Sequence, residues 1–105
     1  MIYAGPLDEA TDTANRAVYG MSRTVTAAAP DAAPADAASA GYKLAASLDY
    51  IAAALTALRD GQSAATEDEA AALALAAGKA AEAAQCARNG AQVGLDRHQA
   101  TTGEG

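Results

Sequence analysis

The sequence lacks several residues on which protein cores and active sites usually depend. It has no Trp and no Phe, one Cys and one His. A single Cys excludes a disulfide framework within one chain, and a single His leaves little for a catalytic or metal-binding cluster. The core must therefore come from a few Leu, Ile, Val, Met and Tyr residues and from Ala, which makes up about a third of the chain.

Positive charge is also scarce. The 105 residues include seven Lys and Arg against 13 Asp and Glu, which gives a formal net charge of -6. The basic residues are scattered, which argues against a nucleic-acid surface and against an anionic membrane surface. No apolar run approaches the ~20 residues of a membrane span, and the first residues do not resemble a signal peptide. We expect no nucleic-acid partner, no membrane partner and a cytoplasmic location.

Helical periodicity is strongest in residues 41–59. Five large apolar residues follow one another there at alternating steps of four and three, which places them on one side of an α-helix. These residues are Leu44, Leu48, Ile51, Leu55 and Leu58. The pattern predicts a central helix on which the rest of the chain packs.

The full pattern predicts three helices, at about residues 7–28, 36–60 and 67–89. Pro30 and Pro34 interrupt the pattern between the first two, and a short loop there favours antiparallel neighbours. We therefore expect an all-α, up-down-up three-helix bundle in residues 1–90. Whether the first two helices close as a hairpin or exchange between chains stays open at this point.

The third helix has the clearest start signal. Thr66 and Glu69 have the spacing of a capping box, in which each side chain binds the other residue's amide. The expected seam of this helix consists almost entirely of alanine: Leu73, Ala77, Ala80, Ala84 and Ala87. Asn89 and Gly90 are typical of a helix end, and residues 91–105, which are rich in glycine, are expected to form a flexible tail.

The residues that most often carry chemistry lie in unpromising places. His98 falls in the expected tail, where a solvated and inert side chain is the simplest interpretation. Cys86 lies late in the third helix, where the helix dipole disfavours a thiolate, so we expect a small apolar residue that is at least half-buried. The acids at 67–69 suit helix capping better than metal binding. We expect no catalytic residue, no cofactor and no metal, and thus a protein that is not an enzyme.

Two surface stripes are the candidate protein contacts. On the third helix, Leu75, Lys79, Glu82 and Cys86 share a face, which is either a partner surface or a support for the first helix. On the first helix, Arg16, Tyr19 and Arg23 form a second stripe, and Tyr and Arg are enriched at interfaces. The tyrosines could equally cover the edges of a small core.

A core of methyl groups buries little area per residue, so a second chain could be needed to complete it. The sequence therefore favours a non-enzymatic interaction module, which self-associates or serves as a small subunit or adaptor. One alternative is a phage- or plasmid-borne or secreted factor that binds a host protein. Another is a small-ligand binder or enzyme accessory subunit, with a pocket near Tyr50, Met21 or Cys86. No motif assigns the chain to a family.

Overall fold

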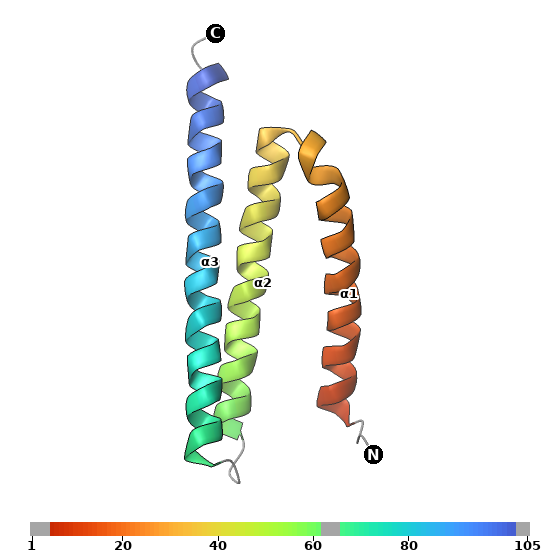
Figure 1. Ribbon diagram of the computed structural model, residues 1–105, viewed down its shortest axis with the longest axis vertical. Helices are drawn as coiled ribbons and strands as arrows, with labels where there is room; N and C mark the ends of the chain where they lie inside the picture. The colour runs from red at the N-terminus through yellow and green to blue at the C-terminus, as the bar shows by residue number, and fades with distance from the viewer. Residues whose placement is uncertain (1–4, 62–65, 103–105) are drawn as a thin grey trace. The chain divides into compact units, whose positions relative to one another are not determined.

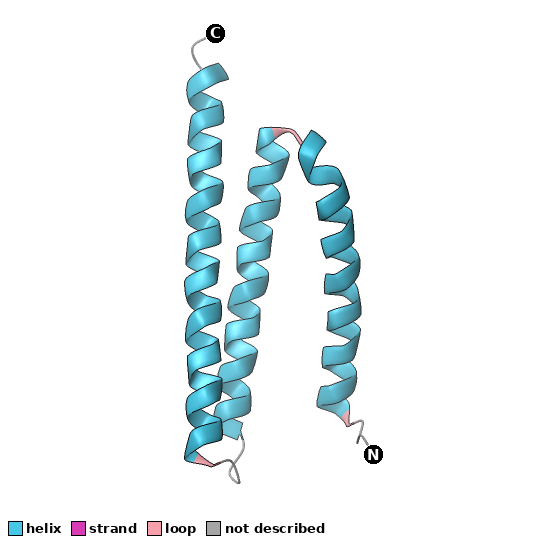
Figure 2. Cartoon of the chain, viewed as in Figure 1, coloured by secondary structure: helices cyan, strands magenta, loops and turns pink. Residues whose placement is uncertain are grey.

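The computed structural model describes residues 5–61 and 66–102, with side chains as far as Ala100. These residues form three α-helices, α1 (Pro6–Ala28), α2 (Pro34–Gly61) and α3 (Glu67–Thr102), and a 3-10 turn, η1 (Ala29–Asp31) (Figure 1). No strand occurs within the described ranges, where loops are limited to a few residues (Figure 2). The predicted all-α fold with three helices is confirmed.

The described residues fall into two units, α1 with η1 and α2 with α3. Helix α1 matches its expected range and begins with a proline. Proline has no amide hydrogen, but the amides of a first helical turn have no partner within the helix, so nothing is lost there. Asp8 and Glu9 lie in that turn, where the helix dipole favours negative charge. None of the residues of α1 is buried, and Leu7, Val18 and Met21 are exposed.

Helices α2 and α3 pack side by side as an antiparallel hairpin (Figure 1). Side-chain hydrogen bonds cross between them: Arg88 donates to Asp49 over 2.6 Å, and the Tyr42 hydroxyl donates to Gln92. Tyr42 precedes Asp49 on α2, whereas Gln92, which binds Tyr42, follows Arg88 on α3. The two helices therefore run in opposite directions. The predicted pairing of the second and third helices is confirmed.

The seam of this hairpin is built from alanine. The four buried residues in the described ranges are Ala38 and Ala45 on α2 and Ala77 and Ala84 on α3. Each pair is separated by seven residues, the repeat that keeps one face of a helix turned towards an antiparallel neighbour. The predicted α3 seam is thereby confirmed, since Leu73, Ala80 and Ala87 are half-buried beside the two buried alanines.

The expected α2 seam needs a correction. The four leucines of the predicted stripe are half-buried, but Ile51 retains 45% of its accessible surface and is exposed. The most deeply buried line of α2 instead passes through Ala38 and Ala45. The physical reason is the alanine face of α3, because small residues on both helices let the two backbones come closer than leucines would.

The flexible tail predicted for residues 91–105 is wrong over most of its length. Helix α3 continues through Thr102, and neither Gly90 nor Gly94 has a positive φ angle. Two glycines cost about 1 kcal/mol each in a helix interior, but packing on α2 offsets that cost. Ala91, Leu95 and His98 are half-buried. Residues 103–105 lie outside the described residues.

The start of α3 forms as its sequence predicts. The Thr66 hydroxyl accepts a hydrogen bond from the Glu69 amide over 3.1 Å, and the Glu69 carboxylate accepts one from the Thr66 amide over 3.3 Å. This reciprocal pair is the capping box, and it satisfies two amide hydrogens that a helix start otherwise leaves unpaired. It fixes the residue at which the chain enters α3.

Glycine-to-alanine changes test how closely the two helices approach. A Cβ atom on Gly41 would lie 3.1 Å from the Cβ of Ala91, whereas one on Gly78 would meet nothing within 4 Å. Gly78→Ala should raise the free energy of unfolding by about 0.5–1 kcal/mol because alanine favours the helix. Gly41→Ala should give clearly less, or destabilise. Urea unfolding followed by circular dichroism measures both, and an equal gain at both positions would contradict the close approach at Gly41.

A second pair of variants tests the alanine seam. Ala84 is fully buried and Ala83, its neighbour in the chain, is exposed. Ala84→Leu should destabilise the fold by about 1–3 kcal/mol, because the added atoms force the helices apart. Ala83→Leu adds the same atoms on the solvent side and should change stability by less than about 0.5 kcal/mol. Thermal unfolding at one fixed protein concentration compares the two, and similar losses would count against a tight seam.

Candidate interaction surfaces

The first candidate surface is the outer α3 face, defined as Leu75, Lys79, Glu82, Cys86 and Val93. These residues follow helical spacing on the side of α3 away from the buried alanines. The two apolar ends are well exposed, Leu75 at 64% and Val93 at 60%. Between them Lys79 and Glu82 form a weak, solvent-exposed ion pair at 3.9 Å, so the middle of the face is electrically balanced.

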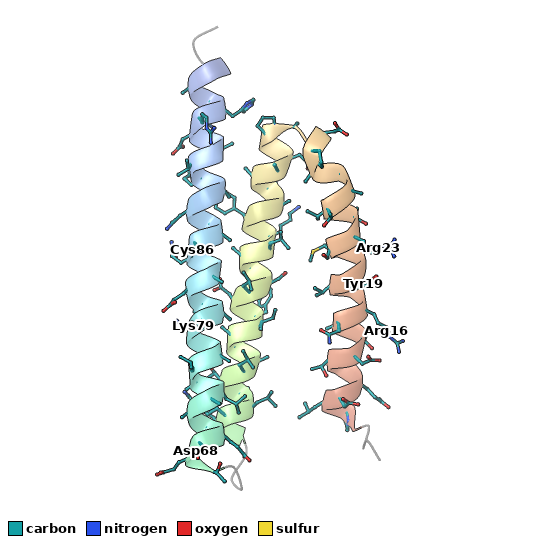
Figure 3. All side chains as sticks on the ribbon, in the orientation of Figure 1. Arg16, Tyr19, Arg23, Asp68, Lys79 and Cys86 are labelled. Atoms are coloured by element: carbon teal, nitrogen blue, oxygen red, sulfur yellow. The ribbon has the colours of Figure 1, made fainter. Side chains whose placement is uncertain are left out.

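Cys86 differs from its expectation. The sequence predicts a small residue that is at least half-buried, but the structure places Cys86 on the exposed side of α3 (Figure 3). The prediction is wrong because the α3 seam passes through Ala84 and Ala87. Residue 86 is two positions from the first and one from the second, and neither step returns to the same face of a helix. Cys86 therefore belongs to the outer α3 face.

The second candidate surface is the α1 stripe of Arg16, Tyr19 and Arg23, which Figure 3 shows along one side of the helix. Tyr19 is 64% exposed, and the guanidinium carbon of Arg23 lies 5.9 Å from the centre of its ring. Such a cation–π contact contributes about 0.5–1 kcal/mol at an exposed site. Arg16 pairs with Asp12, one turn earlier, at 2.9 Å. The stripe thus presents an ordered aromatic ring between two cations.

The α2–α3 hairpin also carries a surface that sequence reasoning misses. A groove of about 650 Å³ runs between the start of α2 and the end of α3. Its walls are small residues between Pro34 and Gly41 on one side and between Ala87 and Gly94 on the other, and it ends at Arg97 and His98. Tyr50, Met21 and Cys86, near which the sequence analysis expects a pocket, do not line this groove.

The structure also changes the interpretation of His98. It is half-buried and lines the groove, whereas the sequence places it in a solvated tail. The error follows directly from ending the third helix at residue 89. Continued helical spacing from Ala84 through Ala87, Ala91 and Gly94 to His98 was the signal that could have found it, because steps of three and four keep these residues on one face.

Acidic residues gather at the start of α3 without forming a metal site. Glu67, Asp68 and Glu69 lie in the first turn, and Figure 3 labels Asp68 there. Within the described residues no group of three or more His, Cys, Asp or Glu side chains is arranged to hold a metal ion. Glu69 instead caps the helix, and the other two acids lie where the dipole favours them.

Comparison with known proteins gives no further information about these surfaces, since no protein-family model, no curated protein and no solved structure matches the chain.

The helices were also compared with the requirements of a membrane span. Within the described residues, no helix combines the length and the apolar character that crossing a bilayer requires.

The end of α2 gives a prediction about pH. Arg59 donates a hydrogen bond to Asp60 over 2.8 Å, which lowers the pKa of Asp60 and raises the pKa of Arg59. Because the pKa of Asp60 is lower in the folded state, its stabilising contribution is present above about pH 4, the usual pKa of Asp, and is lost as pH falls through the lowered value.

The test is an NMR titration of the Asp60 carboxyl carbon. Arg59→Gln should move the pKa of Asp60 up towards its ordinary value, because the charged donor is gone. Lys79→Gln removes the same charge from a different helix and should leave the Asp60 titration unchanged. A pKa that is the same with and without Arg59 would show that this hydrogen bond does not form in solution.

Proposed function

We propose that the protein is a non-enzymatic helical interaction module that works by associating with another protein chain, in the first place with a second copy of itself. One observation carries this proposal. The buried residues of the α2–α3 hairpin are alanines, while larger apolar side chains, including Leu75 and Val93, stay exposed on its surface.

The energetics support association. Burial of apolar surface contributes about 25 cal/mol per Å², so an alanine methyl contributes far less than the roughly 1.5–3 kcal/mol of a buried leucine or valine. A hairpin with an alanine seam therefore has a thin core for its length. A second chain that covers the exposed leucine and valine side chains adds the missing burial and stabilises the fold by mass action.

The outer α3 face is the surface we propose for this contact. Its apolar ends offer the area, and Lys79 and Glu82 cancel each other's charge between them. Two copies of the face can therefore meet without like-charge repulsion between Lys79, Glu82 and their counterparts. The α1 stripe with Tyr19 is a second contact, suited to a partner that carries acidic groups.

The same reasoning limits the other partners. The chain has seven Lys and Arg residues against 13 Asp and Glu, so electrostatic attraction to nucleic acid or to an anionic membrane is disfavoured. We therefore propose neither as a partner. The lone exposed Cys86 suits a reducing compartment, and we propose the cytoplasm.

Light scattering and circular dichroism across a hundred-fold dilution test the proposal. We expect an oligomer that dissociates and loses helicity as it is diluted. The double variant Leu75→Gln, Val93→Gln should dissociate at a concentration more than about tenfold higher, because the two lost apolar side chains together contribute at least about 1.4 kcal/mol. Tyr50→Gln, a change at another exposed apolar residue, on α2, is the control and should dissociate as the natural protein does.

Two results would contradict parts of this scheme. A fully helical monomer at every concentration would overturn self-association. An oligomer that Tyr50→Gln weakens as much as the double variant would overturn the assignment to the outer α3 face.

A further inference from the structure

Four residues of the outer α3 face are spaced symmetrically along the helix. They are Leu75, Lys79, Glu82 and Cys86. They follow one another at steps of four, three and four, so their spacing is the same from either end of the set. These steps keep all four residues on one side of α3, away from the buried alanines of the seam. A second copy of α3 that runs in the opposite direction can therefore match all four positions at once.

The side chains at the matched positions complement each other. In an antiparallel pair Leu75 lies opposite Cys86 of the partner subunit, and Lys79 lies opposite Glu82 of the partner subunit. Cysteine packs as a small apolar residue, so the first match joins two apolar groups. The second match joins opposite charges. Each match occurs twice, because in a twofold contact the two chains exchange the same interactions.

Lys79 and Glu82 are available for such an exchange. Their side chains keep 71% and 73% of their accessible surface, and the ion pair between them within α3 is 3.9 Å long. A solvent-exposed pair of this kind contributes little to stability. Each group can therefore approach the opposite charge on a second chain without the loss of a strong contact in its own helix.

We propose that two chains associate antiparallel through the outer α3 face, in the register that pairs Lys79 of each chain with Glu82 of the other. The twofold axis then passes at the level of Ala80 and Ala81, and Leu75 packs on Cys86 of the partner subunit. This inference rests on the proposed self-association. It adds the direction of the two helices, their register and the residues that meet.

Two other alignments of the same faces fit less well. In a parallel pair Lys79 meets Lys79 and Glu82 meets Glu82, so like charges repel across the contact. An antiparallel pair displaced by seven residues brings Leu75 to Val93 of the partner subunit, but it leaves both charged residues opposite uncharged ones. Of the three alignments, the proposed one gives each charged group its opposite. Val93 then lies at the rim of the contact, opposite the first turn of the partner's α3.

Disulfide cross-linking of the full chain tests the register. In the proposed pair the two Cys86 residues are offset by the 11 positions between residues 75 and 86, about 16 Å along the helices, which is too far for a disulfide. Mild oxidation with copper phenanthroline should therefore give no covalent dimer of the natural chain. Leu75→Cys places a thiol opposite Cys86 of the partner subunit and should give a covalent dimer, in which mass spectrometry finds position 75 linked to position 86.

The control for this experiment is the triple variant Leu75→Cys, Cys86→Ala, Val93→Cys. It also carries two thiols per chain, but they are placed to meet in the displaced alignment. We expect no covalent dimer from it under the same oxidation. Circular dichroism checks that every variant keeps its helicity, and light scattering before oxidation checks that it is associated.

Charge exchange tests the pairing without any cysteine. Lys79→Glu gives a pair with four acids at its centre and Glu82→Lys gives a pair with four bases, so each variant should dissociate at a concentration about tenfold higher or more. A mixture of the two variants restores opposite charges at both matches. It should form a mixed dimer about as stable as the natural one. Lys43→Glu makes the same charge change at an exposed residue of α2 and should have no such effect.

The results separate this inference from the proposed function. A chain that is monomeric at every concentration overturns both. An associated chain overturns only the proposed register if the natural protein links Cys86 to Cys86, if the triple variant forms the covalent dimer, or if Leu75→Cys gives no link between positions 75 and 86. A mixture of Lys79→Glu and Glu82→Lys that dissociates as easily as each variant alone also overturns the register.

Discussion

The close contact of two alanine faces is the constraint on which the α2–α3 hairpin depends. Ala38 and Ala45 on α2 and Ala77 and Ala84 on α3 are the buried residues, and each pair is separated by seven positions. Small residues at this repeat let the helix axes approach closely. The dense van der Waals contact that results compensates for the small apolar area that alanines bury. Polar contacts then fix the alignment along the axes, since Asp49 can meet Arg88 only in one register.

This seam decides where every larger apolar side chain can go. There is no room for leucine between the helices along the alanine line, so Leu48 and Leu55 lie at its edge and are half-buried. Leu75 and Val93 lie on the far side of α3 and stay exposed. The surface available for association is thus a consequence of the seam. A core filled with leucine would have drawn such residues inward and left a more polar exterior.

Much of the fold follows from local rules that this sequence states clearly. Pro6 and the Thr66–Glu69 capping box mark two helix starts, and the alanine spacing of α3 predicts its packing face correctly. The end of α3 could not be predicted in the same way, because Asn89 and Gly90 are a stop signal only when nothing packs beyond them. Ala91 and the residues after it pack on α2, and this long-range contact overrides the local preference. The groove with Arg97 and His98 went unpredicted for the same reason.

The alanine seam and the groove are both lined by small residues of α2 and α3. Along the seam, the alanines are closed off from solvent, since Ala45 and Ala84 have no accessible surface left. Towards the start of α2 and the end of α3, alanines and glycines of the same two helices line a groove that stays open. A methyl group added to Gly90 or Gly94 would meet nothing within 4 Å, so it would not close this groove. Gly90 and Gly94 therefore cost helix stability without bringing the two helices closer together, whereas Gly41 is needed for the close approach to Ala91.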